Sequence, residues 1–159
     1  MSRIRDIVAS IATTLKESTF VSTSPVIPVV EEDSKDIIDE IARASGRSHG
    51  CFILVAFTSA STDNESPGPD LTECVFTVTV VEQPQVWRTK PRFVSCTEVA
   101  EACCRLLHHT SPQDSAGVDL ANGVLSFESM EQSNDDSSLI QTISFNLPVV
   151  LAPTAPTRS

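Results

Sequence analysis

The sequence predicts an α+β domain, a mostly antiparallel four- to five-stranded sheet with helices packed on one face. Apolar residues recur at helical spacing in three segments, and alternating or continuous apolar runs mark the strands between them. Two pairs of strands are consecutive in the sequence, which favours antiparallel neighbours over a doubly wound parallel sheet. The length of 159 residues suits one domain, which we assign to residues 1–151. Residues 152–159 have the composition of a flexible C-terminal tail.

The chain opens with a segment that is predicted to form a helix over residues 3–18. Its apolar stripe consists of Ile4, Ile7, Val8, Ile11 and Leu15. Pro25 and Pro28 then frame a short extended piece at 26–30. Because proline lacks a backbone N–H, this piece fits either an edge strand or an extended loop.

A second helix is predicted to follow the extended piece. Asp33 and Ser34 can cap its first turn, and Gly46 suits its end. Its apolar face consists of Ile37, Ile38 and Ile41.

The middle of the chain predicts the first antiparallel strand pair. Residues 51–57 form a continuous apolar run, which is typical of a strand covered on both faces. Residues 74–82 alternate between apolar and polar side chains, as in a half-buried strand. Residues 61–73 are polar and acidic, and we expect a loop there that is too long for a tight hairpin.

The C-terminal half predicts one more helix and a second antiparallel pair. Ser95 and Glu98 form a capping box, which opens a helix with an apolar face. Residues 124–130 and 141–149 are predicted as strands, with a polar turn at 133–137 between them. The apolar positions of the helix are Val99, Cys103, Leu106 and Leu107.

Charge and cysteine content exclude several classes of protein. The chain has 11 Lys and Arg against 21 Asp and Glu, a formal charge of −10, which disfavours binding to nucleic-acid phosphates and anionic membranes. The longest apolar run, 51–57, is far shorter than a membrane span, and the N-terminus lacks the apolar core of a signal peptide. Five cysteines are an odd number, so we expect reduced thiols in a cytoplasmic setting.

We predict no enzyme, no metal and no cofactor. Cys103, Cys104, His108 and His109 form the only cluster of soft ligands, and Cys104 and His108 share a helix face at i, i+4. A zinc site needs three or four ligands, whereas this helix offers two good ones. We therefore expect a core cysteine and a histidine pair that suits the C-terminal helix dipole. No nucleophile elbow and no glycine-rich phosphate loop are present.

Two polar segments are candidates for contacts with partner proteins. Trp87, Arg88, Lys90 and Arg92 form the one basic patch, and an aromatic beside arginines is typical of an interface anchor. The alternative for this patch is a solvated loop between a strand and a helix.

The acidic loop is the second candidate. Its charges are Asp63, Glu65, Asp70 and Glu73. Such stretches are usually solvated, although in an assembly they can line a channel and repel DNA phosphates.

The order of these elements resembles the tail terminator proteins of long-tailed phages and their tail-completion relatives. The resemblance lies in the opening helix 4–15, in the capped helix 95–107, and in the closing strands 125–127 and 143–147. It covers about residues 1–151 and rests on pattern and order, without an invariant motif. The cysteines of the capped helix and the 61–73 loop have no counterpart that we match to the family.

The resemblance implies a structural virion protein that assembles in the host cytoplasm. A ring of copies, usually six, would cap the finished tail tube, end its polymerisation and join the tail to the head-side connector or stopper protein. DNA would pass through the ring only as transiting cargo, and no membrane would be involved. Two alternatives stay open, namely another neck or connector subunit of the same virion, and a regulatory α+β domain that binds a small molecule.

Overall fold

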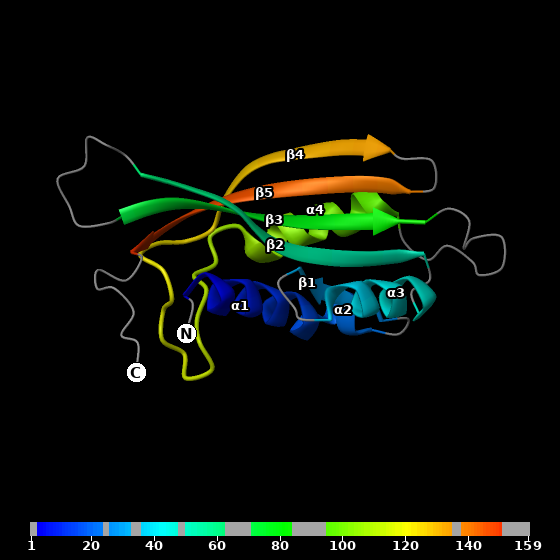
Figure 1. The fold of residues 1–159 in the computed structure, drawn as a ribbon, viewed down its shortest axis with the longest axis horizontal. Coiled ribbons are helices and arrows are strands. Elements are labelled where there is room, and N and C mark those ends of the chain that lie inside the picture. Colours follow the sequence, from blue (N-terminus) through cyan, green and yellow to red (C-terminus); the bar gives the residue numbers. More distant parts are fainter. Residues whose placement is uncertain are drawn as a thin grey trace.

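Within the residues that it describes, the computed structural model has five strands in one sheet, three longer helices and one short helix (Figure 1). It describes residues 3–23, 26–32, 36–47, 50–62, 71–83, 95–134 and 138–150. The elements are α1 (Arg3–Glu17), α2 (Thr19–Ser22), β1 (Val29–Glu31), α3 (Ile37–Arg47), β2 (Cys51–Thr62), β3 (Leu71–Glu82), α4 (Cys96–Leu107), β4 (Ser126–Asn134) and β5 (Leu139–Val150).

The sheet has the strand order β1-β2-β3-β5-β4. Strands β2, β3, β5 and β4 pair antiparallel, and β1 pairs parallel to β2 at one edge. The predicted α+β class, the two antiparallel pairs and the edge position of the proline-framed strand are confirmed. Among the described residues, no helix has the length and apolar character that crossing a membrane requires.

The main core lies between one face of the sheet and the helices α1 and α4. The apolar stripe of α1 is buried there, at Ile7, Val8, Ile11, Ala12 and Leu15. From the sheet, alternate residues of β3 and β5 meet it, and each of these is fully buried. They are Cys74, Phe76, Val78, Val80, Ile143, Phe145, Leu147 and Val149.

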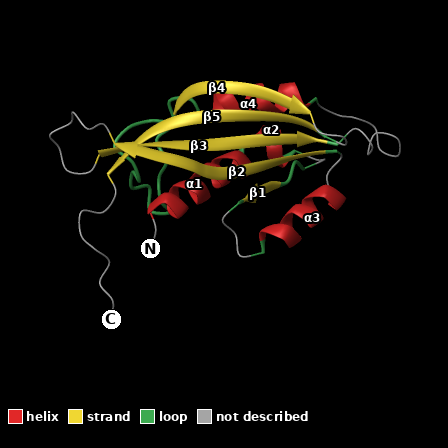
Figure 2. Cartoon of the chain, turned by 45° about the horizontal axis from the view of Figure 1, so that its top comes forward, coloured by secondary structure: helices red, strands yellow, loops and turns green. Residues whose placement is uncertain are grey.

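Helix α3 covers the opposite face of the sheet at the β1–β2 edge, so the prediction that all helices share one face is wrong for this helix (Figure 2). Ile53 and Val55 point into the main core, whereas Phe52 packs in a second cluster with Ala44 of α3 and Val81 of β3. The cause is the parallel pairing of β1 with β2. Parallel neighbours need a crossover connection, and α3 is that connection.

Several boundaries differ from the predicted ones. Strands β2 and β3 extend to Thr62 and from Leu71, so both ends of the expected 61–73 loop are strand. Helix α3 continues past Gly46, and α2 was not predicted. Strand β4 runs to Asn134, into the expected turn. The extensions of β2, β3 and β4 are polar, and they form strand because a neighbouring strand supplies partners for their backbone groups.

Two further expectations lie outside the described residues. These are the caps of the second helix at Asp33 and Ser34, and the tail at 152–159.

Candidate functional site

The residues predicted for partner contacts fall mostly outside the part of the chain that the structure describes. Those outside it are Trp87, Arg88, Lys90, Arg92, Asp63, Glu65 and Asp70. Glu73 is described, and it lies in β3 between Ser61 of β2 and Pro148 of β5. Its side chain is exposed on a central strand, which corrects its assignment to a loop. Burial, and secondarily the charge of Glu73, raises the pKa of the neighbouring Cys74 thiol.

The cysteine–histidine cluster is split between the core and the surface. Cys103 is fully buried, and burial, with a smaller effect of Cys104, raises the pKa of its thiol to about 12. Cys104 is half-buried, and burial followed by the charge of Glu101 raises its pKa. Both thiols are therefore protonated at neutral pH. Within the described ranges, no group of three or more His, Cys, Asp or Glu side chains is placed to hold a metal ion.

The two histidines instead build a surface hollow at the end of α4, which we call the histidine hollow. Cys104, Arg105, His108, His109 and Phe127 line it, and its volume is about 480 Å³. Nδ1 of His108 accepts the backbone N–H of Phe127 at 3.1 Å, and the two imidazole rings lie 3.8 Å apart between centroids. Phe127 contacts Phe145 edge to face but is still 42% exposed.

His109 has a backbone conformation that its residue type seldom adopts. Its φ is +67°, in the left-handed region where glycine is favoured. The position directly follows the C-cap of α4, and its backbone amide donates to the carbonyl oxygen of the buried Leu125 at 2.8 Å. A strained residue at the rim of a hollow is often functional.

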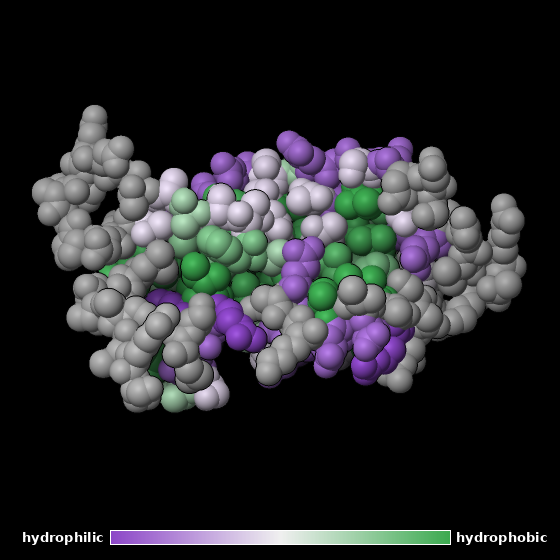
Figure 3. Space-filling model, in the orientation of Figure 1, coloured by the Kyte–Doolittle hydropathy of each residue, from purple (hydrophilic) through white to green (hydrophobic). Residues whose placement is uncertain are grey.

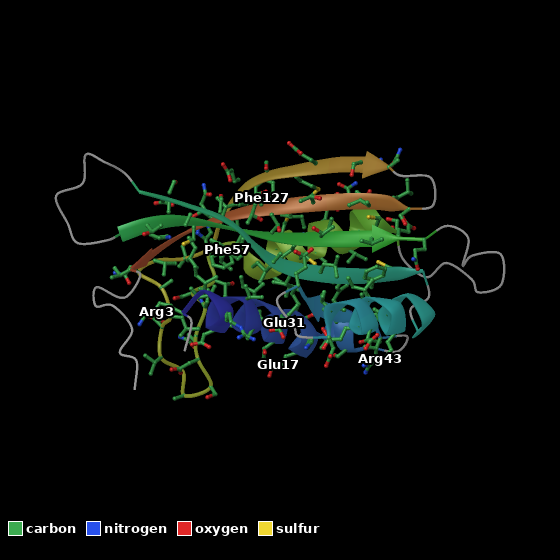
Figure 4. The ribbon with its side chains drawn as sticks, in the orientation of Figure 1. Arg3, Glu17, Glu31, Arg43, Phe57 and Phe127 are labelled. Carbon is green, nitrogen blue, oxygen red and sulfur yellow. The ribbon has the colours of Figure 1, made fainter. Side chains whose placement is uncertain are left out.

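Strand β4 forms one edge of the sheet and borders the histidine hollow through Phe127 (Figure 4). It is nine residues long and mostly exposed, and among the described residues its one strand partner is β5. Its sequence has no lysine or proline, the residues that commonly block edge pairing, although a bulge lies between Phe127 and Ser129.

Strand β1 forms the other edge, and a groove follows it. We call this the β1 groove. It has a volume of about 270 Å³ and lies between α1 and α3, where Glu31 and Arg43 are seen in Figure 4. Its lining consists of Lys16, Pro28, Val29, Val30, Glu31, Glu40, Arg43 and Ala44.

Between the two edges, the sheet face that α3 leaves uncovered consists largely of threonine and serine. Figure 3 shows pale and apolar residues gathered over the middle of the sheet. Thr77, Thr79, Thr142 and Ser144 alternate there with the buried core residues of β3 and β5. None of the five strands contains a lysine or arginine. The sheet therefore presents a long, uncharged to acidic surface.

The comparisons with known proteins concern the fold. No protein-family model matches the chain, and no curated protein matches it. A chain in the solved structure titled "Virion of native gene transfer agent (GTA) particle" is similar to it, with a TM-score of 0.58, 13% identity, and coverage of 89% of this chain and 92% of that one. A second solved structure, whose title states no function, has a TM-score of 0.52, 16% identity and coverage of 94% and 98%. At these identities the likeness shows a shared fold, which extends over nearly the whole of both proteins.

Proposed function

We propose that this chain is a structural protein of a phage-like virion, and more specifically a tail terminator that caps the tail tube as a ring. The observation that carries the proposal is the similarity in fold to a chain of a gene transfer agent virion, over 89% of this chain and 92% of that one. The order of elements, which resembles the tail terminator family, supports the same class independently. This role needs no catalytic site.

The shape of the sheet suits a ring. In the part of the chain that the structure describes, β1 and β4 each pair with one strand only, so both edges of the sheet are open, and they lie at opposite ends of the strand order. A head-to-tail contact between two different surfaces of one chain produces a closed ring when the rotation between copies closes. Six copies is the number that the family resemblance implies.

The charge of the sheet suits a conduit for DNA. Its described charged side chains are carboxylates, and Glu73 and Glu131 are exposed. A surface without lysine or arginine releases no counterions from phosphates and so does not retain DNA. DNA would pass such a ring as transiting cargo.

The tube and the head-side connector or stopper protein are the proposed partners. We assign the tube contact to the basic patch of Trp87, Arg88, Lys90 and Arg92, because the patch combines an aromatic anchor with positive charge in an otherwise acidic chain. The acidic segment with Asp63, Glu65, Asp70 and Glu73 is the second proposed contact.

The proposal is tested by sizing the purified protein by light scattering and by adding it to polymerising tail tube protein. We expect a ring several times the 17.1 kDa protomer mass, tubes that stop growing, and density at one tube end in electron micrographs. A protein that stays monomeric and leaves tube growth unchanged would overturn the proposal. Cross-linking to the connector but not to the tube would instead indicate another neck subunit.

Two variants of the basic patch test the proposed tube contact, and the second is the control for the first. Replacing Arg88, Lys90 and Arg92 by glutamate should abolish tube capping. Replacing Arg88 and Arg92 by lysine keeps the charge and should preserve most of it. If the glutamate variant caps tubes as well as the lysine variant does, the basic patch is excluded as the tube contact.

A further inference from the structure

The outward-facing backbone groups of the edge strand β1 point into the β1 groove. The amide of Ile53 donates to Pro28 O at 2.9 Å, and the amide of Glu32 donates to Val55 O at 3.0 Å. In a parallel ladder, alternate residues face the partner strand, so Val30 faces β2 while Val29 and Glu31 face outward. Two N–H and two C=O groups therefore point away from the sheet at the groove. No partner for them lies in the part of the chain that the structure describes.

The groove holds these groups between two helices on opposite faces of the sheet. Helix α1 contributes Lys16 on one side, and α3 contributes Glu40 and Arg43 on the other. Only a narrow, extended segment that lies along β1 can reach all four backbone groups. Such a segment would add a strand to the sheet.

Strand β4 has the properties of that segment. It is the longer of the two edge strands, and its side chains are mostly exposed. The amide of Phe127 is already bound by His108, which leaves the outer edge from Ser129 to Asn134 for pairing. Its charges are Glu128 and Glu131, and it carries no cation.

We propose that β4 of a second copy of this chain docks in the β1 groove and pairs with β1, so that the sheet continues from one copy to the next. The carboxylates of the incoming strand meet Lys16 and Arg43 at the groove. Glu31 and Glu40 also line it, which limits the net attraction, so backbone hydrogen bonds supply most of the contact. Because α1 and α4 lie on the same face of the sheet, this pairing brings α4 of one copy toward α1 of the next.

This inference rests on the proposed ring and identifies its contact surfaces. Amide hydrogen exchange of the full chain, below and above the assembly concentration, tests it. The amides of Val29 and Glu31 should exchange fast in the monomer and at least about tenfold more slowly in the ring, since they gain partners there. The amide of Val30 should be protected in both states, because it already faces β2.

A pair of proline variants provides a second measurement. Glu31→Pro removes an outward N–H, and edge strands tolerate proline there, so the monomer should remain folded. The protomer concentration at half-assembly should rise about tenfold, as expected for one lost backbone hydrogen bond. Glu32→Pro removes the inward bond to Val55 and should instead destabilise the monomer.

The outcomes separate this inference from the proposed function. A ring in which Val29 and Glu31 exchange as fast as in the monomer, or which Glu31→Pro leaves unchanged, would overturn the β1–β4 contact and leave the ring standing. If no concentration of protein yields a ring, the proposed function fails and the contact fails with it.

Discussion

The two ends of helix α4 are held in opposite ways. At its N-terminus, the Ser95 hydroxyl accepts the amide of Glu98 at 3.2 Å, and a carboxylate oxygen of Glu82 accepts the amide of Cys96 at 3.1 Å. Glu82 is only 1% exposed. At its C-terminus, the chain turns through the left-handed His109 and opens onto the histidine hollow.

The N-terminal end of α4 stabilises the fold, whereas its C-terminal end is exposed and available for contact with a partner. The amides at the first turn of a helix carry partial positive charge, and at α4 a side-chain oxygen of Glu82 and one of Ser95 accept from two of them. The C-terminal turn has instead a strained residue and an exposed phenyl ring. Four perturbations test this comparison, and the three substitutions among them run from the largest expected effect to the smallest.

Of the substitutions, Glu82→Ala should destabilise the protein most, by about 1–3 kcal/mol, because it leaves the buried amide of Cys96 without this acceptor and empties a buried site. Urea unfolding measures the loss. Glu82→Gln keeps a carbonyl oxygen in place and should lose less. An unchanged midpoint for Glu82→Ala would show that the buried carboxylate does not hold the helix end.

Alkaline pH should weaken the core beside α4. The pKa of Cys103 is raised to about 12 in the folded state, while an exposed thiol ionises near its usual value of 9.0. The unfolded chain therefore loses this proton first, and stability should fall as pH rises from about 9 to 12, by up to ~1.4 kcal/mol per pH unit. Unfolding measured across this range should show a shallower decline for Cys103→Ala. The same slope in both proteins would contradict the assignment.

Ser95→Ala should cost about 1 kcal/mol through loss of the N-cap. Ser95→Asp restores an acceptor oxygen at the cap and should recover most of the loss. Thermal or urea unfolding distinguishes them, and equal losses in both variants would mean that the Ser95 hydroxyl contributes nothing as a cap.

His109→Gly should have the smallest effect and the opposite sign, a stabilisation of about 0.5–1 kcal/mol, because glycine adopts the left-handed conformation without strain. His109→Ala keeps the strain and should give no gain. A destabilised glycine variant would show that the contact of the imidazole with His108 outweighs the strain.

Local sequence patterns predicted the elements that bury one regular face. The stripe of α1, the cap at Ser95 and the alternation of β5 appear as predicted, because each pattern reflects burial against a single surface. The polar end of β2 and the start of β3 were predicted as loop. Their strand structure comes from pairing with each other, which their own hydrophobicity does not reveal.

The candidate surfaces were harder to predict. Glu82 carries the charge of a surface residue, and its burial depends on the position of the α4 N-terminus, fourteen residues later in the chain. His108 and His109 were identified as a pair, but their neighbour Phe127 comes from a different element. Most of the residues predicted for partner contacts lie outside the described structure, so those predictions stay open.

The sequence by itself determined the α+β class and the order of the main elements, since these follow from composition and periodicity along the chain. Only the tertiary structure decided that β1 runs parallel to β2, that α3 covers the second face, and that β1 and β4 are the edge strands of the described sheet. The physical reason is that pairing and burial depend on which segments meet in space, and residues distant in the chain supply those partners.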